Sequence, residues 1–337
     1  MKTLMIAVLL TVPSAHALSL PDLLKAYPSH HPEVLQARQD LQQSEAEFRR
    51  TEQDPDTLAF ERLKASHKQS RLKARLQQTV LTSQKSLTDR YWSLFIKTRM
   101  LQELPWKQKL AETKLNIART RKSTGAGTQQ EVQQAEQDLR SLKAEADQTV
   151  LEVEQLCQEL SQQTGLKIQP NTPLTEPAVK TTLPAFKVQI EFRVDVLEAQ
   201  QNVAEAELQL KLLDPIFNSR RDQEERQAAL EGAKTSLEST EAAARRDIQK
   251  ARDDFKKAVS QLFLAEDQLK TQESTYSKDQ QKHQQGILAQ IKLLESEASL
   301  RDSRRKLLEA RQQVADSWAS LAVALNQPMA DPQEKSQ

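Results

Sequence analysis

The stretch Ser123–Val132, STGAGTQQEV, holds two of the five glycines in a chain of 337 residues. Helical apolar patterns lie on both sides of it. A reversal between antiparallel helices needs residues with positive φ, and glycine adopts that conformation without steric cost. Thr128 can cap the returning helix, and Glu131, three residues later, can complete a capping box at the positive helix end. The stretch therefore predicts a sharp turn between two antiparallel helices.

The composition predicts long helices instead of an ordinary globular domain. Only 4% of residues are aromatic and 28% are charged, which is typical of extended helical proteins. The 48 basic and 47 acidic residues are finely mixed, which argues against a nucleic-acid surface. The single cysteine, Cys157, excludes an internal disulfide and lies in a helical pattern as a small packing residue. Packing must hold the chain together.

The start of the chain, residues 1–17, predicts a secretory signal peptide. Lys2 supplies the charged start, Leu4–Val12 the apolar run, and Ala15-His16-Ala17 the small-x-small cleavage site. We therefore expect the mature chain to begin near Leu18, exported to the periplasm or cell envelope. No later run approaches the ~18 apolar residues that a membrane-spanning helix needs, so no transmembrane segment is expected.

Heptad-spaced apolar residues predict three helices in the first half of the mature chain. The stripes are Val34, Ala37, Leu41, Ser44 and Phe48; then Val80, Leu87, Leu94 and Leu101; and then Val132, Leu139, Ala146, Val153 and Leu160. Pro55 follows the first helix and Gly165 is a plausible left-handed cap of the third.

The whole pattern occurs twice. Gly286 is the counterpart of Gly125 in the second half of the chain. The stripe of the returning helix recurs with the same shift in numbering, as Leu293, Leu300, Leu307, Val314 and Leu321. A shared shift across separate features indicates a duplicated unit. We expect repeat 1 at 18–168, a proline-bearing linker at 169–184, repeat 2 at 185–328 and a polar tail at 329–337.

The expected helix lengths specify how each repeat folds. In the first half, the two shorter helices together have about 56 residues and the long helix has about 62. In the second half, the corresponding lengths are about 62 and about 63 residues, and each length corresponds to ~90 Å of helix. Each repeat can thus be one long helix paired with two shorter helices stacked end to end.

Residues 125–136, GAGTQQEVQQAE, resemble the turn motif of TolC-type outer-membrane efflux proteins. The run EQLCQELSQQTGL from Glu154 resembles the end of a repeat in that family, and His31-Pro32-Glu33 resembles part of its mature start. The resemblance covers essentially the whole mature chain.

The resemblance implies a homotrimer whose helices form an α-barrel, a tunnel through the periplasm for efflux or type I secretion. Its turns would meet a periplasmic adaptor (membrane fusion) protein of an inner-membrane pump. The expected adaptor-contacting residues are Gly125, Gly127, Thr128, Glu131 and Val132 in the first turn, and Gly286, Leu288, Ala289, Lys292 and Leu293 in the second.

The second turn departs from the family pattern. Lys292 stands at the family's acidic position, Ala289 at its hydroxyl position, and Leu288 where some members carry a basic gating residue. We therefore expect different electrostatics at the second turn.

A larger departure lies at the opposite ends of the helices, where the family inserts a membrane β-hairpin in each repeat. The connections here, 53–59 (QDPDTLA) and 213–221 (LDPIFNSRR), are shorter than the roughly 20 residues that such a hairpin needs. The predicted fold class is all-α: duplicated long antiparallel helical hairpins, a TolC-like α-barrel protomer without membrane β-hairpins. A separate outer-membrane protein is then a further candidate partner, holding the chain peripheral to that membrane.

Two other function classes remain for comparison. An exported coiled-coil spacer or tether of the cell envelope, with no conduit, needs the same heptads. An enzyme is disfavoured because the five histidines form no HExxH spacing, and no phosphate loop or serine-nucleophile motif is present. The adjacent pair His30-His31 lacks a third ligand nearby, so no catalytic, metal or cofactor site is predicted.

Overall fold

The computed structural model describes residues 17–183, 188–214 and 218–328. The predicted polar tail lies outside these residues, as does the predicted signal peptide apart from Ala17. The helices are α1 (Leu20–Ala26), η1 (Tyr27–Ser29), α2 (Pro32–Gln53), α3 (Ala59–Ser123), α4 (Gln129–Thr164), η2 (Ile190–Phe192), α5 (Val194–Lys211), α6 (Arg220–Gln284) and α7 (Gln290–Leu325).

The predicted all-α class of paired helices is confirmed. Helices α3 and α6 each have 65 residues, and α4 and α7 each have 36. Helix α3 packs on α2 and α4 in turn, and α6 packs in the same way on α5 and α7. The only β-type pairing in the described residues is an isolated bridge between Leu18 and Leu174.

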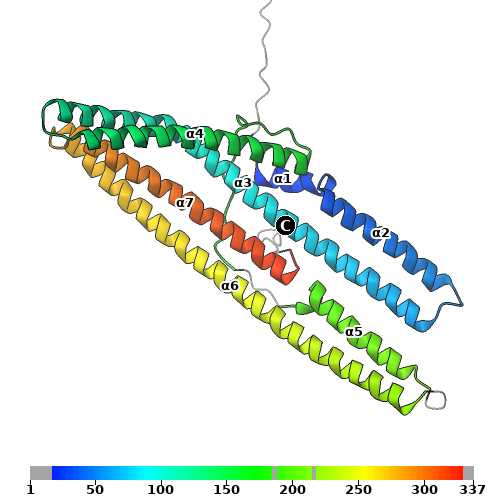
Figure 1. Ribbon diagram of the computed structural model, residues 1–337. Helices are drawn as coiled ribbons and strands as arrows, with labels where there is room; N and C mark the ends of the chain where they lie inside the picture. The colour runs from blue at the N-terminus through cyan, green and yellow to red at the C-terminus, as the bar shows by residue number, and fades with distance from the viewer. Residues whose placement is uncertain (1–16, 184–187, 215–217, 329–337) are drawn as a thin grey trace, which may run out of the picture.

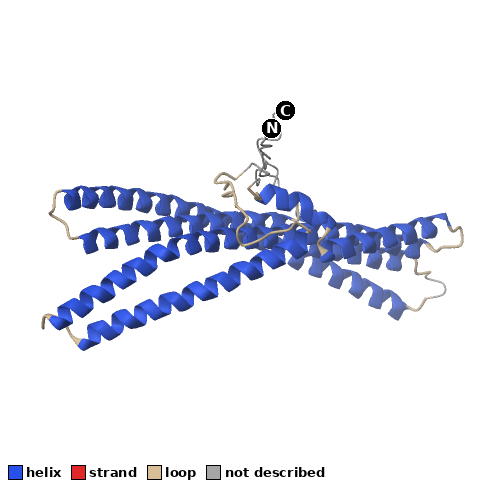
Figure 2. Cartoon of the chain, turned by 90° about the horizontal axis from the view of Figure 1, so that it is seen from above, coloured by secondary structure: helices blue, strands red, loops and turns tan. Residues whose placement is uncertain are grey.

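The two hairpins lie side by side in a single layer. Helix α3 packs on α7 and α5, so the helix order is α4–α3–α7–α6 in one half of the molecule and α2–α3–α5–α6 in the other. Among the described residues, no comparable packing joins α4 to α6 or α3 to α6. Figure 1 shows the α3–α4 and α6–α7 turns at the same end of this layer. Figure 2, seen from above, shows the hairpins diverging toward their ends.

The helices end where the sequence indicates, with one difference. Helix α2 stops just before Asp54-Pro55, and Gly165 caps α4 with a φ of 69°. The sequence of the second half predicts a first helix at about residues 190–213, but α5 begins only at Val194, after the short turn η2. The Arg193 guanidinium lies 2.7 Å from the Asp195 carboxylate and 3.2 Å from that of Asp247. These contacts hold Arg193 in an extended conformation ahead of the helix.

The segment between the two repeats packs against both of them. Three of its apolar residues, Leu174, Val179 and Leu183, lie against four hydrophobic clusters of the helices, and each of the three contacts two clusters. Leu174 and Val179 share one cluster, and Val179 and Leu183 share another. The clusters belong to both hairpins, so the linker fastens the repeats together along the middle of the layer.

Tyr91 on α3 ties the start of the chain to this linker. Its side chain is fully buried, and its hydroxyl lies 2.7 Å from the carbonyl oxygens of both Leu18 and Thr175. Burial raises the pKa of Tyr91 to about 12, so the hydroxyl keeps its proton and can donate it to either carbonyl.

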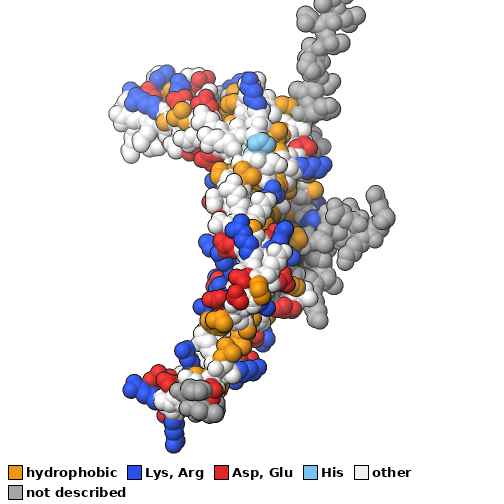
Figure 3. Space-filling model, turned by 90° about the vertical axis from the view of Figure 1, so that its right-hand side faces the viewer, with side chains coloured by type: hydrophobic (Ala, Val, Ile, Leu, Met, Phe, Trp, Pro, Cys, Tyr) orange, Lys and Arg blue, Asp and Glu red, His pale blue; other side chains and the backbone are white. Residues whose placement is uncertain are grey.

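The exposed surface is polar and of mixed charge. On the face shown in Figure 3, basic and acidic side chains are interspersed among scattered apolar ones. Within the described ranges, no helix combines the length and the apolarity that crossing a membrane requires.

Three charged residues face one another where α3 meets α7. The Lys85 ammonium lies 2.6 Å from the Asp316 carboxylate and 3.5 Å from that of Asp89. Burial, followed by the negative charge of Asp316, raises the pKa of Asp89 although Lys85 opposes the shift. One lysine is thus shared between two carboxylates.

We expect Tyr91→Phe to lower the free energy of unfolding by about 1 kcal/mol, because the hydrogen bond from the buried Tyr91 hydroxyl to the Leu18 and Thr175 carbonyl oxygens is lost. Tyr276→Phe on α6 is the control and should be nearly neutral, since the described part of the chain offers the Tyr276 hydroxyl no hydrogen bond. Urea denaturation followed by circular dichroism measures both. Equal effects of the two substitutions would show that the Tyr91 contacts add nothing.

Asp89→Asn should stabilise the protein at neutral pH. The folded-state pKa of Asp89 is raised, so the native state binds the proton more tightly and stability falls as pH rises above the ordinary pKa of the carboxyl group. The amide removes this cost. Since the Asp89 side chain is 34% exposed and water screens the repulsion, we expect a gain of at most ~1 kcal/mol at pH 7.

The stability gained by Asp89→Asn should shrink toward zero near pH 4, where the carboxyl group of Asp89 in the unsubstituted protein binds a proton. Asp147→Asn, on the exposed surface of α4, is the control and should show no such pH dependence. Thermal unfolding at several pH values measures the difference. A gain for Asp89→Asn that does not depend on pH would contradict the charge-repulsion account.

Candidate functional site

The predicted turn residues form the ends of the two hairpins, which we call tip one (residues 124–128) and tip two (residues 285–289). At tip one, the Gly125 N–H donates to the Lys122 carbonyl at 3.1 Å, and the Ala126 N–H donates to the Arg121 carbonyl at 2.8 Å. Gly125 has a φ of 75°. This pair of bonds is a Schellman cap, which satisfies the last carbonyl groups of α3 and reverses the chain.

Tip two repeats this backbone arrangement. The Gly286 N–H donates to the His283 carbonyl at 2.9 Å, and the Ile287 N–H donates to the Lys282 carbonyl at 2.9 Å. The φ of Gly286 is also 75°. Each donor and each acceptor of tip two has the same position relative to Gly286 as its equivalent in tip one has relative to Gly125. The two turns therefore have the same backbone hydrogen bonds.

The restart of the helix differs between the tips. At tip one, the Thr128 hydroxyl accepts the Glu131 N–H at 3.2 Å, and the Glu131 carboxylate accepts the Thr128 N–H at 3.2 Å. This is the predicted capping box. A Cβ atom on Gly127 would lie 2.8 Å from the Glu131 carboxylate and 2.9 Å from Cβ of Arg121. Gly127 therefore lets the turn close tightly over the box.

At tip two, the capping box is missing. Ala289 occupies the N-cap without a side-chain acceptor, and Lys292 stands in the first turn of α7, where a positive charge is unfavourable to the helix dipole. Lys292 instead pairs with Glu295 at 2.9 Å, and this hydrogen bond lowers the pKa of Glu295. The His283 Nδ1 atom lies 2.8 Å from the Leu288 carbonyl oxygen, a contact that joins the two sides of the turn.

The tips also differ in which apolar side chains reach solvent. Val132 is only 6% exposed and packs inside the first hairpin, and Leu288 and Leu293 are half-buried. Ile287, which the sequence analysis missed, is 72% exposed and is the most exposed large apolar residue described. Its signal in the sequence is an apolar residue directly after the turn glycine, where tip one has Ala126.

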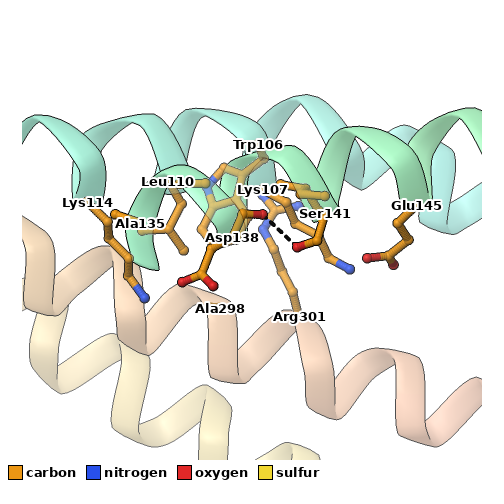
Figure 4. Close-up of a pocket in the computed structure, with 12 residues that line it drawn as sticks. Trp106, Lys107, Leu110, Lys114, Ala135, Asp138, Ser141, Glu145, Ala298 and Arg301 are labelled. Carbon is orange, nitrogen blue, oxygen red and sulfur yellow. Dashed lines mark hydrogen bonds between the residues drawn. The ribbon is translucent and has the colours of Figure 1, made fainter. Parts of the chain in front are cut away.

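A groove lies behind the tips, where the hairpins diverge. Its volume is about 370 Å³, and Trp106, Leu110 and Ala135 line it together with charged side chains from α3, α4 and α7 (Figure 4). The Arg301 guanidinium lies 4.6 Å from the centre of the Trp106 ring and pairs with Glu297 on its own helix at 2.7 Å.

Lys114 reaches Glu295 across the same gap between α3 and α7, at 4.0 Å. The hairpins are thus joined behind the tips by contacts that are half exposed to water. The tips themselves belong to separate hairpins, and the ten predicted residues form two surfaces instead of one.

No feature of the described residues points to a metal centre. They contain no group of three or more His, Cys, Asp or Glu side chains that could hold an ion. His31 caps α2 and is 9% exposed, and a Cβ on Gly165 would lie 2.5 Å from the His30 ring.

The structure closely resembles solved outer-membrane channels. The Campylobacter jejuni CmeC channel superposes with a TM-score of 0.64 at 13% identity, over 94% of this chain and 88% of that one. The open-state Neisseria gonorrhoeae MtrE channel gives 0.63 at 14% identity, over 91% and 89%. The Vibrio cholerae outer membrane protein VceC gives 0.62 at 15% identity, over 92% and 97%.

No protein-family model matches the sequence, and no curated protein matches it either. At these identities the likeness shows the fold alone. The chain has the fold of the TolC-type outer-membrane channels, as its turn motif and duplication predicted.

Because only tip one has a capping box, matched substitutions at the N-caps of α4 and α7 should have opposite effects on helix stability. Thr128→Ala should weaken the start of α4 by about 1 kcal/mol, because the Glu131 N–H loses its acceptor. Ala289→Ser should strengthen the start of α7 by a similar amount, since the new hydroxyl can cap it. Amide hydrogen exchange at the first turn of each helix measures both effects. Faster exchange in Ala289→Ser would contradict this account of tip two.

Proposed function

We propose that the chain is the protomer of a periplasmic tunnel, a homotrimeric helical barrel that serves an efflux or type I secretion assembly of the cell envelope. The observation that carries the proposal is the single layer of helices. A helix packed in a solid bundle contacts several others around one core. Here, among the described residues, the helix packing between the hairpins is mainly that of α3 on α7 and α5, and the layer ends in two outermost helices.

Rotational copies of such a layer can join edge to edge and enclose a central space, because a head-to-tail contact closes into a ring when the rotation matches. The polar, mixed-charge surface suits walls that meet water on both sides. The channels that share this fold, CmeC and MtrE among them, are outer-membrane channels by description, which supports a conduit over a spacer.

The tips are the proposed docking surface for a periplasmic adaptor protein of an inner-membrane pump. Both tips lie at one end of the molecule (Figure 1). Each presents exposed backbone and side chains on a rigid helical end, and tip two adds the exposed Ile287. Exposed apolar residues with a polar surround are typical of protein–protein contacts.

We further propose that this protein is exported and lies against the outer membrane. A separate outer-membrane protein would be its partner at the end opposite the tips. There the connection between α2 and α3 is the short segment 54–58. The sequence of residues 1–17 supports export.

The test is the shape and mass of the purified mature protein without detergent. We expect sedimentation at the mass of three chains and, in negative-stain electron microscopy, end-on views of a hollow ring. A solid rod would favour the alternative, an envelope spacer with no conduit. A stable monomer at micromolar concentration would contradict the tunnel.

A further inference from the structure

Two polar contacts between the hairpins contain groups that can take up a proton as the pH falls. The first lies where α3 packs on α5, in the half of the molecule remote from the tips, and the second lies where α3 packs on α7. The hairpins diverge toward their ends (Figure 2), so the contacts between them determine how far they spread. A change of charge at these contacts therefore acts on the whole layer.

The first contact joins His67 of α3 to Glu205 of α5. The His67 Nδ1 atom lies 3.0 Å from the Glu205 Oε1 atom, and the two side chains are 13% and 20% exposed. Histidine side chains change charge between about pH 5 and pH 8. A neutral imidazole can donate an ordinary hydrogen bond to this carboxylate, whereas a protonated imzidazole donates a charge-assisted one, which is about twice as strong. Proton uptake at His67 therefore strengthens the contact.

Glu205 is the charged group that the structure joins to His67. The neighbouring Lys68 on α3 pairs with Glu47 of α2, and Lys234 on α6, behind α5, pairs with Glu231 at 3.6 Å. The other charged side chains within about one helical turn of this level are Lys64 and Arg71 on α3, Glu45, Arg49 and Arg50 on α2, Glu207 on α5 and Arg226 on α6.

The second contact joins Lys85 and Asp89 of α3 to Asp316 of α7. The Lys85 ammonium lies between the two carboxylates, as described above. Burial and the charge of Asp316 raise the pKa of Asp89, and Asp316 lies beside Asp89 only while α7 is packed on α3. The packed arrangement therefore binds this proton more tightly than a spread one. By linkage, proton uptake at Asp89 favours packing.

The other charged groups around Asp89 balance one another. On α3, the Arg90 guanidinium lies 2.8 Å from the Glu159 carboxylate of α4, and on α7, Arg311 pairs with Glu176 of the linker. The charged side chains on the remaining neighbours are Asp22 and Lys25 on α1, and Asp247, Lys250, Asp254 and Lys257 on α6, which line a groove together with Asp316. Each of these helices supplies as many basic as acidic groups here, so the excess negative charge is that of Asp89 and Asp316.

We propose that the two contacts together form a proton-controlled latch between the hairpins. Proton uptake at His67 tightens the α3–α5 contact and proton uptake at Asp89 tightens the α3–α7 contact, so both act in the same direction. Mildly acidic solution holds the hairpins together, and mildly alkaline solution lets them spread. The latch is a property of one chain and goes beyond the proposed tunnel, since it operates whether or not copies of the chain form a ring.

Distances between two spin labels, measured by pulsed electron paramagnetic resonance, test the latch. Labels on Asp56→Cys and Lys211→Cys, two exposed positions, report the spread of the hairpins at the end remote from the tips. Cys157 is 2% exposed and should stay unlabelled. Labelled chains are mixed with an excess of unlabelled chains, so that only distances within one chain are recorded. We expect the distance to shorten and its distribution to narrow from about pH 8 to about pH 5.

Substitutions at the first contact identify the groups responsible. His67→Gln keeps a hydrogen-bonding side chain that cannot gain a charge, so most of the pH response at this label pair should be lost. Glu205→Gln removes the partner's charge and should have the same effect, which provides a second variant if the first fails to fold. His283→Gln is the matched control and should keep the full response, because the His283 ring contacts a carbonyl oxygen of its own hairpin at 2.8 Å.

The second contact is tested by combining His67→Gln with Asp89→Asn, which should abolish the remaining response. Equal distances at both pH values in the otherwise unsubstituted protein would overturn the inference. A full response in the combined variant would also overturn it, because other groups would then be responsible. A response that His283→Gln removes as completely as His67→Gln would overturn it as well. These outcomes leave the proposed tunnel untouched, since sedimentation and electron microscopy test it separately.

Discussion

The packing of α3 on α7 is the contact on which the rest of the structure depends. Each hairpin has its own internal stripe of apolar residues, and this contact, together with that of α3 on α5 and the packing of the linker, sets the hairpins side by side in one layer. Trp92 and Phe95 of α3 form its apolar centre with Leu308 and Ala315 of α7. Burying large aromatic residues of this kind gives the contact much of its free energy. The Lys85 ammonium, shared between the Asp89 and Asp316 carboxylates, joins α3 to α7 beside that centre.

Most of the fold follows from the sequence because long helices carry a strong periodic signal. The stripe positions Leu87, Leu94, Val153 and Leu160 are all buried as expected. The turn chemistry at Gly125, Thr128 and Glu131 is local, so it could be derived from residue types alone. The duplication extended the same reasoning to the second half, where Gly286 has the φ of its counterpart.

What the sequence could not supply are contacts between distant segments. Nothing in a heptad pattern indicates that Leu174 and Val179, in a proline-bearing linker, lie against the helices of both repeats. Arg193, which directly precedes α5, pairs with Asp247, which is 54 residues away in the chain. The exposure of Ile287 was missed because an apolar residue in a turn can be buried or exposed, and only the packing of the two hairpins decides which.

The unequal helix starts at Thr128 and Ala289 have a consequence for symmetry. The two repeats of one chain have the same backbone turn but different side chains, acidic and capped in one, basic and uncapped in the other. In a ring of three copies, six tips would follow one another around the rim in alternation. The backbone of such a rim would have nearly sixfold symmetry, whereas its side chains would have only threefold symmetry. A partner with six identical arms would therefore meet two kinds of site on such a ring.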